Sequence, residues 1–158
     1  MPDIQELVKN NLQENKVLDL EKHNLGDAGV SELAQMEVLG EVIRLELGEN
    51  GITDMGLMIL ALSPFVSNLK SLNLKSNKIT SIGIQALTSS PNLSNLDQLI
   101  LKFNDIGEEG ARLIANSSTL TKLTTLDLFR SKIGKEGAEA IKQSPLYKNL
   151  TRVRLSET

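Results

Sequence analysis

Residues 96–114, LDQLILKFNDIGEEGARLI, carry the pattern that decides the fold. From Leu99 onward this segment follows L-x-L-x-x-N-x-I-x-x-x-G, and the same string or a close variant returns at intervals of 27 residues. Its first position is filled by Leu18, Leu45, Leu72, Leu99, Leu126 and Val153. A fixed period in the twenties is the sequence signature of a solenoid, in which each repeat stacks on the next. We therefore expect a stack of similar coils.

Each repeat is expected to contain a short strand followed by a helix. In the third repeat Leu72 and Leu74 alternate with polar residues, which is the period of a half-buried strand. Gly83 is expected to begin a helical segment in which Leu87 faces the core. Pro91 is expected to end that segment and send the chain toward the next strand. One repeat cannot bury its own apolar face, so the coils must bury it against one another.

A polar position lies five residues after the first leucine of each repeat. An inward-facing asparagine can donate two hydrogen bonds and accept others. Because backbone groups at a turn have no sheet partner, an asparagine at each level can join the turn of one coil to that of the next. We predict a ladder of this kind, in which the first and last members are weaker, from His23, Asn50, Asn77, Asn104 and Ser131.

The string L-x-x-L-x-L-x-x-N-x-I-x-x-x-G-x-x-x-L, present over residues 96–114, resembles the leucine-rich repeat family. It is similar to the ribonuclease-inhibitor-like subclass, which includes the sensing domains of NOD-like receptors and the Ran GTPase-activating proteins. The resemblance covers about residues 12–158. It implies an α/β fold, a right-handed horseshoe-shaped solenoid with a parallel β-sheet on the concave face and helices on the convex face. It implies less about function, because the shared residues are the buried ones.

The chain is expected to form one domain over residues 1–158. Residues 1–16 are predicted to be an N-terminal capping helix, with repeats beginning at about residues 17, 44, 71, 98 and 125 and a final strand over 152–158. An open edge at this last strand indicates a piece of a longer array or an end covered by a partner. Self-association through this C-terminal edge is a further alternative.

The composition narrows the class of partner. The net charge is −3 at pH 7, with 7 Lys/Arg against 12 Asp/Glu in residues 1–79 and 10 against 8 in residues 80–158. This balance argues against nucleic acid as a general partner. The chain has no cysteine, no recognisable signal peptide and no apolar stretch near the roughly 20 residues that span a bilayer. We expect no membrane partner and a cytoplasmic location, or delivery into a host cytosol for a bacterial effector.

No sequence motif indicates catalysis or a cofactor. The chain has no glycine-rich phosphate loop, no G-x-S-x-G and no zinc-type spacing. His23 is the only histidine, and it occupies a ladder position. The pair Glu108–Glu109 and Asp54 fall at expected helix starts, where they favour the helix dipole and are predicted to face solvent. We therefore expect no catalytic residue, no metal, no cofactor and no enzymatic activity.

The remaining candidate is the concave surface, formed by the outward positions of the strands. Acidic side chains dominate the first two strands, whereas Ile100, Phe103 and Phe129 are expected to form an apolar cluster on the fourth and fifth. Aromatic side chains ringed by basic residues are typical of a binding hot spot. Two alternatives stay open: single exposed apolar residues are ordinary, and Phe103 could fold over its turn and pack within the array. The predicted partner-binding residues are Glu46, Lys75, Ile100, Lys102, Phe103, Phe129, Arg130, Arg152 and Arg154.

These observations predict a non-catalytic module that binds a protein partner through its concave face. One alternative is a regulator of another enzyme, by GTPase activation or by inhibition, as the resemblance to Ran GTPase-activating proteins implies. Another is a structural fragment of a longer multidomain receptor or bacterial effector. The repeat pattern by itself does not separate these functions.

Overall fold

The structure of the protein is a computed structural model, which describes residues 2–158. Within that range the chain contains six strands and six α-helices. The strands are β1 Val17–Asp19, β2 Arg44–Glu46, β3 Ser71–Asn73, β4 Gln98–Ile100, β5 Thr125–Leu128 and β6 Arg152–Leu155. The α-helices are α1 Ile4–Asn11, α2 Gly26–Ala34, α3 Asp54–Ala61, α4 Ser81–Thr88, α5 Gly107–Ala115 and α6 Gly134–Lys142. Three short 3₁₀ helices lie between a helix and the next strand: η1 Glu37–Glu41, η2 Pro91–Leu93 and η3 Tyr147–Asn149.

The strands form one open parallel sheet in chain order, β1-β2-β3-β4-β5-β6. Their register advances by 27 residues at each step, so that Leu18 lies opposite Leu45 and Leu126 lies opposite Val153. Equivalent positions of every repeat therefore share one level, and the leucines of that level stack into a continuous core from which solvent is excluded. The α/β solenoid predicted from the 27-residue repeat is confirmed.

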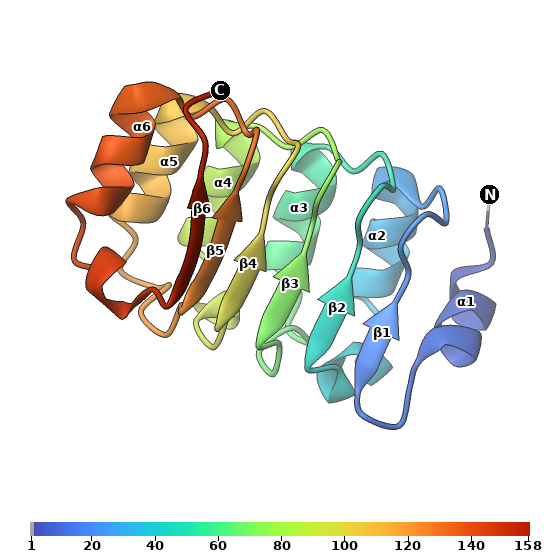
Figure 1. The fold of residues 1–158 in the computed structure, drawn as a ribbon. Coiled ribbons are helices and arrows are strands. Elements are labelled where there is room, and N and C mark those ends of the chain that lie inside the picture. The colour runs from blue at the N-terminus through green and yellow to red at the C-terminus, as the bar shows by residue number, and fades with distance from the viewer. Residues whose placement is uncertain (1) are drawn as a thin grey trace.

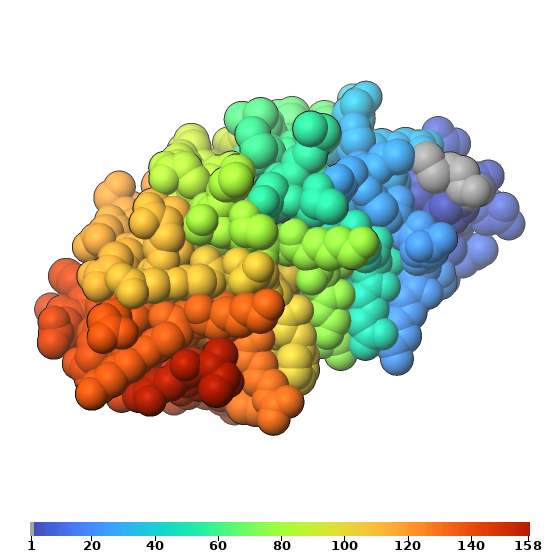
Figure 2. Space-filling view, turned by 90° about the horizontal axis from the view of Figure 1, so that it is seen from above, coloured from blue at the N-terminus to red at the C-terminus, as the bar shows by residue number. Residues whose placement is uncertain are grey.

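Helices α2–α6 lie on one side of the sheet and leave the other side free, and α1 lies beyond β1 at the N-terminal end of the stack (Figure 1). We call the free side the concave face and the helical side the convex face. Seen from above, the coils follow one another in chain order from one end of the molecule to the other (Figure 2). Each helix turns its apolar stripe toward the sheet, as Ile84 and Leu87 of α4 do. The two faces and the turns that join them are therefore surfaces available to a partner.

The helices of the repeats, α2–α6, begin in two ways, which depend on the residue at or just before the helix start. At α3 and α4 that residue is Thr53 or Thr80, whose hydroxyl accepts a hydrogen bond from the backbone N–H two residues later. At α2, α5 and α6 it is a glycine with φ between +59° and +71°, a conformation that favours glycine. The prediction that Gly83 begins a helix is wrong by two residues, since α4 begins at Ser81 behind its threonine cap.

The N-terminal helix is shorter than predicted. α1 covers only residues 4–11 of the expected 1–16 cap, and Met1 lies outside the described residues. Asp3 caps its start by accepting a hydrogen bond from the Glu6 N–H, and at Leu12 the backbone becomes extended. Ile4 and Val8 are buried, so α1 covers the apolar end of the first coil.

The last strand is also shorter than predicted. β6 ends at Leu155, the last residue with a register partner on β5, and residues 156–158 are not strand. β6 pairs with β5 alone, so it is the edge of the sheet within the described chain. Its outward residues Arg152 and Arg154 are exposed.

Candidate functional site

Asparagine side chains join the turns of adjacent coils. Asn50 is 1% exposed, and its Oδ1 accepts hydrogen bonds from the backbone N–H groups of His23 and Leu25 at 3.0 and 3.3 Å. The amide oxygen therefore satisfies two backbone N–H groups of the preceding coil that have no sheet partner. Its Nδ2 donates, at 2.9–3.1 Å, to the carbonyl oxygens of Leu20, Leu47 and Gly48.

The other predicted ladder positions differ in what they do. Asn77 repeats the arrangement of Asn50 one coil further on, and Asn104 does so two coils further on with its Oδ1 accepting one backbone N–H, that of Ile79. Ser131 reaches only carbonyl oxygens, with its hydroxyl 2.9 Å from the Leu101 carbonyl. The His23 imidazole makes no hydrogen bond within residues 2–158, so only the backbone of His23 takes part.

The residue before each ladder position has a left-handed backbone. A large side chain seldom takes this conformation, because its Cβ crowds the backbone. The N–H at the first four of these turns donates to a carbonyl of the next coil, as Phe103 N–H does to the Phe129 oxygen at 3.0 Å, and the Arg130 N–H donates to the Ser156 hydroxyl at 2.7 Å. This contact fixes the turn and holds its side chain at the end of the strand. The φ values are +61°, +55°, +54°, +60° and +50° at Lys22, Glu49, Ser76, Phe103 and Arg130.

Two phenylalanines and two arginines form a cluster where β4 and β5 end. The rings of Phe103 and Phe129 meet edge to face, with centroids 5.8 Å apart and planes at 84°. The guanidinium carbons of Arg154 and Arg130 lie 4.4 and 5.5 Å from the Phe129 centroid, within cation–π range. Phe103 is 43% exposed, so ring surface faces solvent. We call Phe103, Phe129, Arg130 and Arg154 the aromatic–arginine cluster.

A buried carboxylate holds this cluster in place. Asp127 is 7% exposed, and its Oδ1 accepts a hydrogen bond from the Phe129 N–H at 3.0 Å. Its Oδ2 lies 3.4 Å from Nη1 of Arg154, which stands opposite in the strand register. Asp127 was assigned no role from the sequence. The 27-residue spacing between Asp127 and Arg154 was the signal that could have identified the pair.

The cluster is smaller than the predicted patch. Phe103 and Phe129 lie on turns beyond the ends of β4 and β5, whereas the sequence placed them on the strands. Ile100 lies within β4, half-buried and opposite Asp127. Lys102 occupies the position of Phe129 one coil earlier, and Arg152 lies opposite Thr125 at the start of β6. Neither has an ion-pair partner among the residues that the structure describes.

Lys75 was expected to border the aromatic cluster. Its ammonium group instead pairs with a glutamate carboxylate. Its Nζ lies 2.7 Å from Oε1 of Glu21, two coils away. The side chain passes over Gly48, where an added Cβ would lie 2.8 Å from Lys75 Cγ. Lys75 can reach Glu21 because Gly48 has no side chain to obstruct it. Larger residues fill the equivalent position in the other repeats.

Glu46, another predicted binding residue, belongs to the same charged surface over β1–β3. Its carboxylate accepts hydrogen bonds from Nε of Arg44 at 3.0 Å and from Nδ2 of Asn73 at 2.9 Å. The acidic end of the concave face is therefore largely neutralised within the chain. The aromatic–arginine cluster is the better candidate for an outside partner.

The Lys75–Glu21 pair makes stability depend on pH in the alkaline range. The hydrogen bond to Glu21 raises the pKa of Lys75 above its usual 10.5, and the charges of Glu49 and Glu46 act in the same direction. A raised lysine pKa stabilises the fold fully below the unfolded-state pKa, and this stabilisation is lost as pH rises through the folded-state pKa. We expect the difference in unfolding free energy between wild type and Lys75→Met to be constant to about pH 10 and to shrink above it.

The measurement is urea unfolding of both proteins between pH 8 and pH 12. Lys102→Met is the matched control, since Lys102 occupies the same position one coil further on. Glu21→Gln should remove the pH dependence that separates wild type from Lys75→Met. If the difference in unfolding free energy between wild type and Lys75→Met stays constant through pH 12, the Lys75–Glu21 pair contributes nothing to stability.

Two features of the convex side were missed in the sequence. Asp54, predicted to face solvent, accepts hydrogen bonds on Oδ1 from the N–H groups of Thr80 and Gly83 at 2.7 and 3.0 Å, and on Oδ2 from the Thr80 hydroxyl. Asp27 does the same for Thr53 of the coil after it. Spacings of 26 residues between aspartate and threonine were the available signal.

A row of serines forms the second missed feature. Ser63 and Ser90 donate their hydroxyls, each at 2.6 Å, to carbonyl oxygens at the end of the preceding coil's helix. Ser117 does so at 3.2 Å. The three residues are 27 apart, and each satisfies a carbonyl that the helix leaves without an internal partner. These contacts are structural, and they leave the helix surfaces free.

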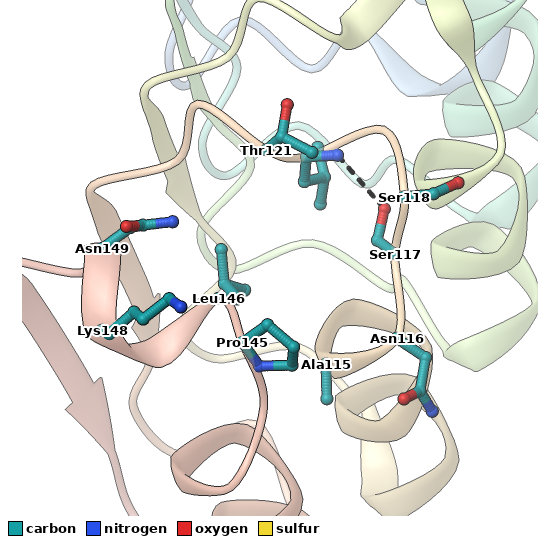
Figure 3. Close-up of a pocket in the computed structure, with 10 residues that line it drawn as sticks. Ala115, Asn116, Ser117, Ser118, Thr121, Pro145, Leu146, Lys148 and Asn149 are labelled. Carbon is teal, nitrogen blue, oxygen red and sulfur yellow. Dashed lines mark hydrogen bonds between the residues drawn. The ribbon is translucent and has the colours of Figure 1, made fainter.

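The groove between the last two coils has mostly uncharged walls. It combines Ala115, Pro145 and Leu146 with amides and hydroxyls, and Lys148 is the one ionisable side chain in its lining (Figure 3). Across residues 2–158, no three side chains of the His, Asp and Glu type are gathered so as to hold a metal ion. None of the helices in that range has the length and apolar character to cross a membrane.

Comparison with known proteins relates the chain to a repeat family. A family profile described as "Leucine Rich repeat" matches residues 16–34, 67–87, 92–115 and 119–142, more than half of the chain. A comparison with curated protein sequences gives no match. The solved structure of the leiomodin-1 actin-binding site 2 is similar over 94% of this chain and 90% of its own, with a TM-score of 0.61 and 19% identity. An internalin from Listeria monocytogenes aligns with 81% of this chain and 38% of its own, with a TM-score of 0.44 and 23% identity.

Proposed function

This chain belongs to the leucine-rich repeat family, whose domains generally mediate protein–protein interaction, and from that premise we propose that it binds a protein partner through the aromatic–arginine cluster. Binding would be non-covalent and would need no cofactor. The likeness to the leiomodin-1 structure supports the fold and, at 19% identity, leaves the identity of the partner open.

The observation that carries this proposal is the exposed aromatic pair stacked against two arginines. Aromatic and arginine side chains are enriched in the parts of interfaces that contribute most to affinity. Here Phe103 is exposed, and its left-handed turn fixes its backbone. Asp127 holds Arg154 over the Phe129 ring. Side chains that are already positioned lose less conformational entropy when a partner binds.

The charge around the cluster indicates what the partner's surface carries. Lys102 and Arg152 are free of ion pairs within the described chain, and Arg130 adds a third positive charge at the same end of the sheet. A partner with acidic side chains around an apolar centre would match this surface. Such charges act mainly on the rate of association and on its dependence on salt.

The test compares two faces of the same molecule. We expect Phe129→Ala to weaken binding by about 2 kcal/mol, roughly thirtyfold in Kd, because the change removes the ring that contacts Phe103, Arg130 and Arg154. The unfolding free energy should fall by about 1–2 kcal/mol, the contribution of the aromatic pair and the two cation–π contacts. Partners recovered with immobilised wild type are identified, and their Kd is then measured for each variant by calorimetry.

Glu139→Ala is the matched control, because Glu139 is exposed on α6 of the convex face. It should bind the recovered partner as wild type does. A partner that is lost with Glu139→Ala and kept with Phe129→Ala would place the interface on the convex face and overturn the proposal.

A further inference from the structure

The convex face carries a compact apolar surface on α3 and α4. Four of the most exposed large apolar side chains lie there: Met55 is 64%, Met58 42%, Leu62 78% and Ile82 65% exposed. We call these four residues the convex patch. Contiguous exposed apolar side chains in a soluble protein often mark an interaction site.

The repeat itself shows that the fold does not need these side chains. Each position of the convex patch recurs at intervals of 27 residues on α2–α6 or at their C-caps, and α2 and α6 fill the same positions with small or polar residues. The position of Met55 holds Ala28 on α2 and Glu136 on α6. The position of Leu62 holds Gln35 and Gln143. The apolar character is therefore particular to α3 and α4, while α2 and α6 pack in the same way without it.

The convex patch lies beside two grooves. One groove of about 480 Å³ runs between α3, α4 and α5 and has Met58, Ile82 and Leu113 in its walls. The other, of about 360 Å³, lies between Met58, Leu62 and Pro91 and is lined mostly by apolar atoms. Met58 borders both grooves, so they form one continuous surface. Methionine side chains adapt to the shape of a partner, which suits a docking surface.

The spacing on α3 matches one face of a partner helix. Met55, Met58 and Leu62 stand at i, i+3 and i+7, which places them along a line of about 10 Å on the helix surface. An amphipathic helix whose apolar residues have the same i, i+3, i+7 spacing can lay them in the grooves beside α3.

The surroundings of the convex patch are acidic. The acidic residues of helices α2–α5 are Asp27, Glu32, Asp54, Glu108 and Glu109, and Arg112 is their one basic residue. Arg112 is paired with Glu108 at 2.8 Å, and the two aspartates are engaged in capping the next helix. Glu109 lines the larger groove directly, and Glu32 is exposed on α2. Neither Glu32 nor Glu109 has an ion-pair partner among residues 2–158.

We propose that the convex patch is a second docking surface, whose occupant is a basic amphipathic helix of another protein. The apolar stripe of that helix would cover Met55, Met58, Leu62 and Ile82, and its lysines or arginines would meet Glu32 and Glu109 on either side. Charge complementarity of this kind selects a basic partner over an acidic one. The convex patch is separated from the aromatic–arginine cluster by the thickness of the sheet and helix layers, so the two surfaces can be occupied independently (Figure 1).

The probe is a synthetic helical peptide of about five turns, with leucines at i, i+3 and i+7 and lysines on the flanking positions. A second peptide carries glutamate in place of every lysine. Fluorescence anisotropy measures the affinity of each peptide, and amide chemical shifts locate the binding. We expect saturable binding of the basic peptide, at least tenfold tighter than that of the acidic one, with shifts confined to α3, α4 and their neighbours.

The variants are taken from the repeat. Met55→Glu combined with Leu62→Gln installs residues found at the same positions of α6, so its melting temperature should match that of wild type. This variant should lower the affinity for the basic peptide at least tenfold. Glu32→Gln combined with Glu109→Gln should reduce the preference for the basic over the acidic peptide. Thr125→Ala on the concave face is the control and should bind as wild type does.

Three results would overturn the proposal. The first is equal binding of the two peptides, and the second is full binding by the Met55→Glu, Leu62→Gln variant. The third is evidence for a different occupant of the convex patch. Such evidence would be a wild-type dimer in sedimentation, or binding of wild type to neutral phosphatidylcholine vesicles, that the Met55→Glu, Leu62→Gln variant abolishes. Each result is independent of the concave face, so the function proposed there is tested separately.

Discussion

Replacing Asn50 with alanine is expected to lower the free energy of unfolding by about 3 kcal/mol, because buried backbone groups would lose their partners. The Asn50 side chain is 1% exposed, and it satisfies two N–H groups of the first turn and three carbonyl oxygens. Water cannot easily replace it at this depth. Urea unfolding at pH 7 measures the change, and the slope with urea should stay the same if only stability is affected.

Two further substitutions separate the parts of this effect. Asn50→Asp keeps the acceptor for the His23 and Leu25 N–H groups and removes both donors, so it should also be strongly destabilising. Asn77→Ala should cost less than Asn50→Ala, about 2 kcal/mol, because Asn77 makes similar bonds at a half-buried position. If Asn50→Ala melts like wild type, the ladder is not what joins the coils.

The stacking of this fold could be predicted because a parallel solenoid converts sequence spacing into position. A residue and its equivalent 27 positions later lie side by side, as Leu72 and Leu99 do. Burial of one face of each coil requires an apolar residue at the same place in every repeat, and this requirement makes the pattern visible. The ladder followed from the same logic, since its asparagines must recur where the turns recur.

Pairings that span two coils, or that depend on an absent side chain, could not be predicted in this way. Lys75 reaches Glu21 only because Gly48, one coil between them, has no side chain to obstruct the path. The turn positions of Phe103 and Phe129 were missed because each strand is only three or four residues long, so that alternation fails before the aromatic residues are reached. The convex patch was missed because apolar residues on a helix are ordinarily assigned to the core.

The aspartates that cap the following helix are expected to be nearly as important as the ladder. Asp54→Ala should lower the unfolding free energy by about 2 kcal/mol, because hydrogen bonds to a charged acceptor are worth more than neutral ones. The lost bonds come from the Thr80 N–H, the Thr80 hydroxyl and the Gly83 N–H. Gly83 is required for this approach, since an added Cβ would lie 2.6 Å from Asp54 Oδ1.

The repeat again supplies the control. Glu108 occupies the position of Asp54 two coils further on, where the next helix begins at a glycine and has no threonine to be capped. Its carboxylate pairs with Arg112 at the surface, so Glu108→Ala should change stability by no more than about 0.5 kcal/mol. Equal losses of unfolding free energy for Asp54→Ala and Glu108→Ala, measured by urea unfolding, would mean that a charge at the helix start stabilises the fold and the bonds to the threonine cap do not. A loss confined to Asp54→Ala would show that the aspartate fixes the start of α4 from the neighbouring coil.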